Sequence, residues 1–158
     1  MQVLVLYHSR GGNTGKLARS IAEGVTGEGC EAVVRSCAEV TKDDFERSAG
    51  IIAGSPVYFG VMAAELKKVF DDFVGLRRKM EDKVGAAFAT GGHHSGGKET
   101  TLFSIIQCMM IYGMIIVGDP MDASGHYGVA CLREPDDTAL ADGRKLGSRV
   151  ARLCRRLG

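Results

Sequence analysis

The stretch QVLVLYHSRGGNTGKLARSIAEGVTG, residues 2–27, contains the pattern that decides the fold. Its first six residues, Gln2 to Tyr7, are almost wholly apolar and rich in valine and leucine, which is typical of a strand covered on both faces. Residues 14–27 then place apolar side chains at helical spacing, and Gly27 provides a stop signal. The stretch therefore predicts a strand, a glycine-rich loop and a helix.

The same alternation continues along the chain. We expect further strands at residues 31–36, 50–55, 83–90 and 114–118. Helices are expected from about Met62, from Glu99 to Gly113, and over a last segment that contains Leu146, Val150, Leu153 and Leu157. Five buried strands that alternate with helices predict an α/β fold, a doubly wound and mostly parallel sheet with helices on both faces.

Composition excludes several classes of function. The 158 residues fit one domain, residues 1–158, and 20 basic residues nearly balance 19 acidic ones, which argues against nucleic acid or anionic membranes as partners. The most apolar stretch, residues 108–118, is too short for a membrane span, and the N-terminus lacks signal-peptide features, so we expect a cytoplasmic protein. Five scattered cysteines without a C-x-x-C pair disfavour zinc and disulfides, and no metal site is predicted.

Glycine is the compositional anomaly, at 22 of 158 residues. Many of these glycines fall in the segments that follow the carboxyl ends of the predicted strands: residues 8–14, 55–60, 90–98 and 119–128. In a doubly wound sheet, ligands bind outside this edge, where the strand order reverses. The glycines therefore cluster where a ligand is expected.

The first of these loops has the composition of an anion site. Backbone N–H groups at the helix start, with donors from Ser9, Asn13 and Thr14, predict a pocket for a phosphate. A Walker loop is excluded because Arg10 and Leu17 stand at key positions, and G-x-G-x-x-G is absent. The alternative interpretation is a tight glycine turn with a Thr or Asn cap.

The second and third loops leave more than one interpretation open. Tyr58 and Phe59 could form a platform for a flat ring, although adjacent aromatics more often pack in a core or at a rim. His93 and His94 have no third ligand at a suitable spacing, so solvated loop histidines are favoured over a metal site. His93 also stands where a hydrolase nucleophile elbow requires glycine.

Taken together, the motifs resemble a known family. S-x-x-G-N-T, G-S-P-V-Y-F-G, A-T-G-G-H-H-S-G-G-K-E-T-T, Y-G-M-I-I-V-G and H-Y-G occur in order across essentially the whole chain. They resemble the flavodoxin-like fold and, more narrowly, the tryptophan repressor-binding-protein group of NAD(P)H:quinone oxidoreductases. This resemblance implies a five-stranded parallel sheet of order 2-1-3-4-5, FMN as the cofactor and NAD(P)H as the co-substrate.

The resemblance also implies roles for individual residues. The residues that would cradle the FMN phosphate are Ser9, Arg10, Gly11, Gly12, Asn13 and Thr14. Those that would line the isoalloxazine ring are Pro56, Val57, Tyr58 and Phe59, while Thr90, Gly91, Gly92 and His93 would pass beneath its edge. Tyr112 replaces a histidine of the quinone reductases, so it is either close to the substrate or an ordinary helix-end aromatic.

Two functions follow as expectations. As an enzyme, the protein would take a hydride from NAD(P)H and reduce a quinone or similar small acceptor; as a carrier, it would pass electrons between redox protein partners. The net charge of +1 and the absence of tryptophan favour the reductase, and no side chain is expected to be catalytic. A flavin-binding regulatory scaffold is a third class.

Met109, Met110 and Ile111 could line a homo-oligomer interface, but helical spacing favours the core.

Overall fold

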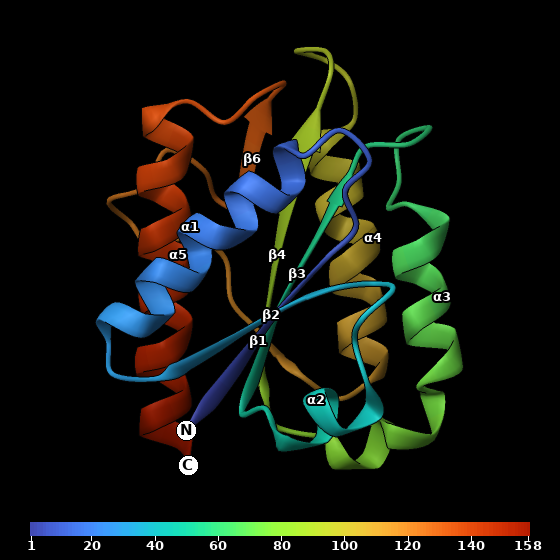
Figure 1. Ribbon diagram of the computed structural model, residues 1–158, viewed down its shortest axis with the longest axis vertical. Helices are drawn as coiled ribbons and strands as arrows, with labels where there is room; N and C mark the ends of the chain where they lie inside the picture. The colour runs from blue at the N-terminus through green and yellow to red at the C-terminus, as the bar shows by residue number, and fades with distance from the viewer.

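The computed structural model describes all 158 residues as a parallel sheet between two layers of helices (Figure 1). The strands are β1 (Gln2–Tyr7), β2 (Glu31–Ser36), β3 (Gly50–Pro56), β4 (Val84–Gly91), β5 (Ile115–Ile116) and β6 (Val129–Leu132). The helices are α1 (Asn13–Gly27), α2 (Lys42–Arg47), α3 (Ala64–Asp72), the 3-10 helix η1 (Val74–Lys79), α4 (Lys98–Ile111) and α5 (Asp137–Leu157). The strand order β2-β1-β3-β4-β5 confirms the predicted sheet.

The fifth position of the sheet is filled by two short strands. β5 pairs with Val84 and Gly85 at the start of β4, whereas β6 pairs with the end of β4, from Phe88 to Gly91. Residues 117–128 leave the sheet between them. The expected strand at residues 114–118 is therefore too long, and β6 was not predicted because its four residues follow a glycine- and polar-rich loop.

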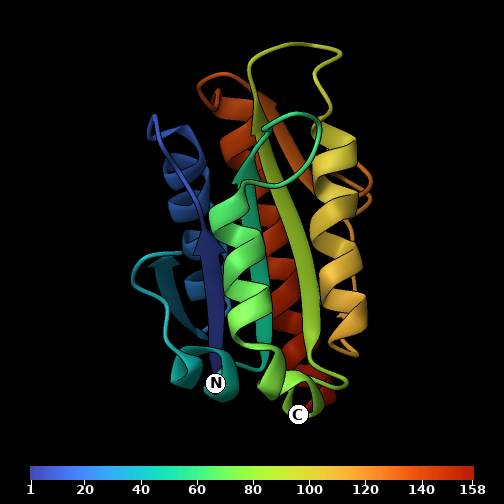
Figure 2. The same cartoon turned by 90° about the vertical axis from the view of Figure 1, so that its right-hand side faces the viewer.

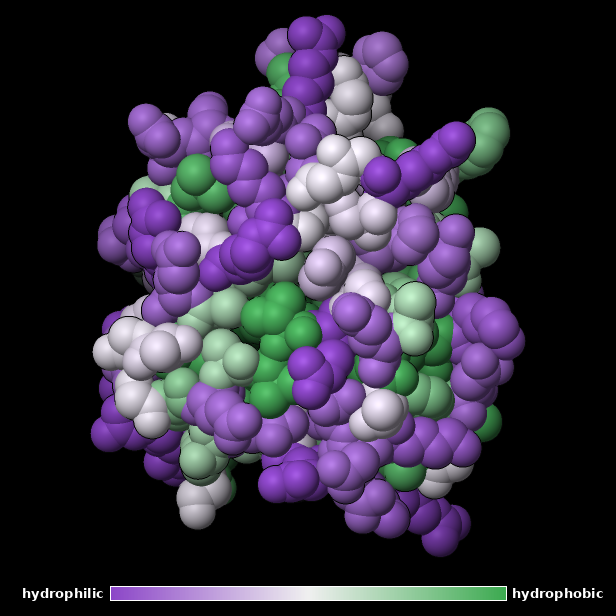
Figure 3. Space-filling view, viewed as in Figure 1, coloured by the Kyte–Doolittle hydropathy of each residue, from purple (hydrophilic) through white to green (hydrophobic).

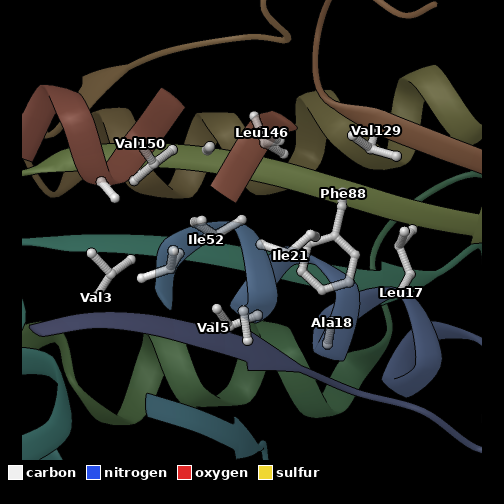
Figure 4. Close-up of a cluster of buried hydrophobic side chains, with 14 of the residues drawn as sticks. Val3, Val5, Leu17, Ala18, Ile21, Ile52, Phe88, Val129, Leu146 and Val150 are labelled. Carbon is white, nitrogen blue, oxygen red and sulfur yellow. The ribbon is translucent and has the colours of Figure 1, made fainter. Parts of the chain in front are cut away.

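Each face of the sheet has its own apolar core. α3 and α4 cover one face and α1 and α5 the other, as Figure 2 shows. On the α1/α5 side, Phe88 and Ile52 from the strands meet Leu17 and Ile21 from α1 and Leu146 from α5 (Figure 4). Alternating strand residues point to opposite faces, so the apolar runs that predicted buried strands supply both cores.

α1 and α5 approach each other closely at glycines. A Cβ added at Gly24 would overlap the backbone carbonyl of Arg144, and one added at Gly147 would overlap the carbonyl of Ile21. Helix backbones at this separation exclude any side chain at these two positions. The packing of α1 against α5 therefore depends on the missing Cβ atoms.

The surface is largely hydrophilic, and on the face shown in Figure 3 apolar side chains gather mainly in the middle, over the edge strand β2.

The burial of residues at the end of α4 differs from the prediction. Met109 is buried, but Met110 and Ile111 are exposed, so the expectation that all three pack in the core is wrong. No helix combines the length and apolar character of a membrane span.

Replacing Gly24 with alanine tests the close helix contact. Alanine raises intrinsic helix stability by about 1 kcal/mol, yet here its methyl group would displace α5, so we expect a net loss of roughly 1–3 kcal/mol in the free energy of unfolding. Urea titration measures this loss. Gly27→Ala is the matched control, because a Cβ there has no atom within 4 Å. Equal stability of the two variants would contradict the packing argument.

Candidate functional site

Three loops meet above the carboxyl ends of β1, β3 and β4, at the top of Figure 1. Parallel pairing brings these ends to one edge: Tyr7 stands opposite Gly54, and Pro56 stands opposite Thr90. The loops surround an open cavity of about 270 Å³. The site therefore lies where the strand order reverses, as the sequence predicts.

Eleven of the fourteen residues predicted to bind FMN line this cavity. They are Ser9, Arg10, Gly11, Asn13, Thr14, Pro56, Val57, Tyr58, Thr90, Gly91 and Gly92. The other three lie in the same loops without lining it. Gly12 shapes the first loop at a φ of 91°, Phe59 is fully exposed, and the carbonyl of His93 accepts a hydrogen bond from Lys98.

The N-terminus of α1 opens into the cavity without a capping side chain. The first helical hydrogen bond runs from the N–H of Lys16 to the carbonyl of Gly12. The N–H groups of Asn13, Thr14 and Gly15 precede it and are not engaged by a side-chain cap. Such a terminus presents free donors and the positive end of the helix dipole to an anion. The alternative of a loop closed by a Thr or Asn cap is excluded.

Two hydroxyl contacts hold the loop in this shape. The N–H of Gly12 donates to Oγ of Ser9 at 3.1 Å, which folds the loop back before the helix. Oγ1 of Thr14 lies 2.8 Å from Oγ1 of Thr90 and links the helix start to the end of β4. Both threonines are buried, so this contact fixes the relative position of two loops that are 76 residues apart.

Arg133 is a lining residue that sequence analysis missed. It follows β6 directly and lines the cavity together with Arg10. Both arginines are exposed to solvent and neither side chain forms an ion pair within the protein, and the lining contains no carboxylate, thiol or histidine. The electrostatics favour an anion. The only signal in the sequence was a basic residue after a short apolar run, V-A-C-L, at residues 129–132.

Tyr112 lies far from this cavity, so its assignment next to the substrate is wrong. It caps the end of α4, a helix of 14 residues and thus about 21 Å long. That end lies at the bottom of Figure 1, opposite the three loops. The hydroxyl of Tyr112 donates to the carbonyl of Phe70 at 2.5 Å, and its ring packs against Phe45 and Phe70. Tyr112 is a buried core residue.

A larger cavity of about 490 Å³ lies between β6, the loop 119–128 and the first turns of α4 and α5. Asp119 and Asp142 both line it and both are buried. Asp142 accepts hydrogen bonds from Ser124 and Lys145, whereas neither carboxylate oxygen of Asp119 has a partner. Burial, assisted by the charge of Asp142, raises the pKa of Asp119 to about 6. This acidic cavity is chemically opposite to the cavity with two arginines.

The fold and site define a class: a doubly wound α/β protein whose switch point carries a pocket lined by two arginines, an uncapped helix N-terminus and Tyr58. The family model described as NADPH-dependent FMN reductase matches residues 35–127. That match covers more than half of the chain. The protein therefore belongs to the NADPH-dependent FMN reductase family.

Individual relatives agree with this membership. An NAD(P)H dehydrogenase (quinone) of Archaeoglobus fulgidus is 34% identical and aligns over 99% of this chain and 98% of its own length. A flavodoxin of Aquifex aeolicus is 35% identical, over 95% and 85% of the two chains. The crystal structure of a WrbA-like flavodoxin of Agrobacterium tumefaciens has a TM-score of 0.85 with 24% identity and covers 99% of each chain, which shows the fold.

The raised pKa of Asp119 predicts a dependence of stability on pH. Between the ordinary value of 3.8 and about 6, the folded protein holds a proton that the unfolded chain has released. The free energy of unfolding should therefore fall as pH rises through this window. Asp119→Asn should remove that fall and stabilise the protein at pH 7.5 by on the order of 2 kcal/mol, with little effect at pH 3.5.

Urea titrations at a series of pH values measure this dependence. Asp122→Asn is the matched control, because Asp122 is exposed in the same loop. If the free energy of unfolding of the wild type and of Asp119→Asn changed with pH in parallel, the pKa of Asp119 would not be raised in the folded protein, which would contradict the prediction.

Proposed function

We propose that the protein is an FMN-dependent oxidoreductase that accepts a hydride from NAD(P)H and reduces a quinone or a similar small acceptor. Residues 1–158 would work as one domain around one FMN site. The observation that carries the proposal is the cavity lined by an uncapped helix N-terminus and by two arginines that form no ion pair within the protein. This donor set suits a phosphate monoester, and the aromatics beside it suit a flat ring.

The residues present fit FMN by shape as well as by charge. A Cβ added at Gly11, Gly12 or Gly92 would meet no protein atom within 4 Å, so all three glycines face open space. Phosphate and ribityl groups can approach the backbone there, as side chains would not permit. Tyr58 lines the cavity, and Phe59 follows it in sequence with its side chain fully exposed.

The proposed division of labour follows from these positions. Residues 9–14 would hold the phosphate, residues 56–59 would line the ring, and residues 90–93 would offer backbone donors to the ring edge. FMN, when bound, supplies the hydride and electron chemistry. The lining contains no general acid or base, so its residues would bind, orient and leave one face open to the nicotinamide and then to the acceptor.

Relatives support this choice of substrates. The printed names of the relatives from Archaeoglobus fulgidus and Azorhizobium caulinodans, 34% and 32% identical, are both NAD(P)H dehydrogenase (quinone). The alignment with the former has 189 positions, more than the 158 residues of this chain, so that relative contains additional residues. The shorter chain retains the elements that surround the cavity.

Electron transfer between proteins is the second candidate function. The Aquifex flavodoxin favours it, and so does the exposed ring of Phe59, which suits contact with a partner protein. A carrier generally docks through a charged face, however, and the net charge of this chain is only +1. The reductase is therefore the preferred function.

Hydride acceptance distinguishes the two. The protein is reconstituted with FMN, freed of unbound flavin and mixed anaerobically with NADH or NADPH while the visible absorbance of the bound flavin is followed. We expect rapid bleaching, and recovery of the absorbance on addition of a benzoquinone. A yellow protein that does not bleach would support the carrier instead. Failure to retain FMN would contradict both functions.

The assignment of the first loop to the phosphate is tested by a double replacement, Ser9→Ala with Thr14→Ala. Loss of two donors to a charged group should weaken FMN binding at least about tenfold, far more than the binding of riboflavin, which lacks the phosphate. Titration of flavin fluorescence measures both affinities. Thr14→Ser is the conservative control because it keeps the hydroxyl. Equal losses for the two flavins would refute the assignment.

A further inference from the structure

Arg133 has an unusual backbone conformation for its residue type. Its φ of 61° lies in the left-handed region, which only three non-glycine residues of this chain occupy: Phe59, Asp82 and Arg133. Such a conformation costs energy for a long side chain and persists where surrounding contacts enforce it. Here the N–H of Arg133 donates to the carbonyl of Gly91 at 2.6 Å, which fixes the turn to the end of β4.

The neighbours of Arg133 bring it to the start of α1. The next residue, Glu134, forms an ion pair of 2.9 Å with Lys16 in the first turn of that helix. Gly91, to which Arg133 is bonded, follows Thr90, whose hydroxyl contacts Thr14. Arg133 is thus held in the lining of the cavity that also contains Asn13 and Thr14 at the start of α1.

The charge of Arg133 has no partner inside the protein. Glu134 is adjacent in sequence but engages Lys16, and the cavity lining contains no acidic residue. Arg10 and Arg133 therefore line one cavity to which the protein supplies no counterion. Both side chains are exposed to solvent, so both are accessible to an anion that enters this cavity.

We propose that Arg133 is a phosphate-recognition residue, and that the left-handed turn is retained because it directs the guanidinium group to the phosphate of FMN. This inference rests on the proposed function. The same chemistry could recognise the 2′-phosphate of NADPH. The ties of Arg133 to Gly91 and of Glu134 to α1 favour the FMN phosphate, because they place the residue at the helix terminus that suits this group.

The experiment separates the charge of Arg133 from the strain of its turn. Arg133→Gly removes both, whereas Arg133→Gln removes the charge and keeps a long side chain. Asp82→Gly is the matched control, because Asp82 has a φ of 65° and lies outside the cavity. Binding of FMN, riboflavin, NADPH and NADH is measured by fluorescence titration at low and high salt, and the unfolding temperature of the flavin-free protein is measured in parallel.

Both Arg133 variants should bind FMN about tenfold more weakly or worse, and riboflavin as tightly as wild type. The difference should shrink at high salt because the interaction is ionic. Arg133→Gly and Asp82→Gly should unfold at or above the wild-type temperature, since glycine accepts the left-handed turn. Asp82→Gly should leave FMN affinity unchanged.

Three outcomes would overturn the inference. Equal losses for FMN and riboflavin would mean that Arg133 only supports the loop. Unchanged FMN binding with a loss of NADPH relative to NADH would assign the residue to the nicotinamide donor, and unchanged binding of all four molecules would leave it without a role at the site. If the wild-type protein itself does not bind FMN, the proposed function fails along with this inference.

Discussion

The hydrogen bonds that hold β3 between β1 and β4 determine where every functional loop lies. They set Tyr7 opposite Gly54 and Pro56 opposite Thr90, so three chain segments leave the sheet within one small region. Because the strands are parallel, each must be connected by a crossover, and the helices that make these crossovers cover both faces. The cavity is a consequence of strand direction, and the loops add its chemistry.

Residue chemistry then makes this edge positive in a protein of nearly balanced charge. The net charge is +1, yet the cavity contains two arginines, a helix N-terminus and no acidic residue. Beyond β6, the larger cavity has the opposite character, because its lining includes the buried carboxylates of Asp119 and Asp142. The division of the fifth strand into β5 and β6 creates this contrast, since the residues that leave the sheet between them include Asp119.

Local patterns in the sequence predicted the alternating strands and helices and the position of the ligand loops, whereas the strand order and the individual site residues came from the resemblance to a family. Apolar runs in the sequence predict strands such as β1 and β4, and the glycine-rich segments that follow these runs predict the loops. Tyr112 was misplaced because sequence proximity to a strand does not say at which edge the residue lies; the length of α4 decides that. Met110 was misplaced because α4 carries apolar residues such as Phe103 and Ile111 on its exposed face as well, so spacing could not identify its buried face.

Arg133 could not be predicted for a different physical reason. A left-handed turn is announced in sequence by glycine or asparagine, and an arginine in that conformation has no such signature. It becomes visible only when β6 is seen to pair with the end of β4, which brings residue 133 next to Gly91 although 42 positions separate them. The loop residues of this cavity, Arg10 included, were thus predicted from the sequence, while the second arginine reaches it through a tertiary contact. The left-handed backbone conformation of Arg133 is unfavourable in the free protein, and interactions with a charged ligand would offset that unfavourable energy.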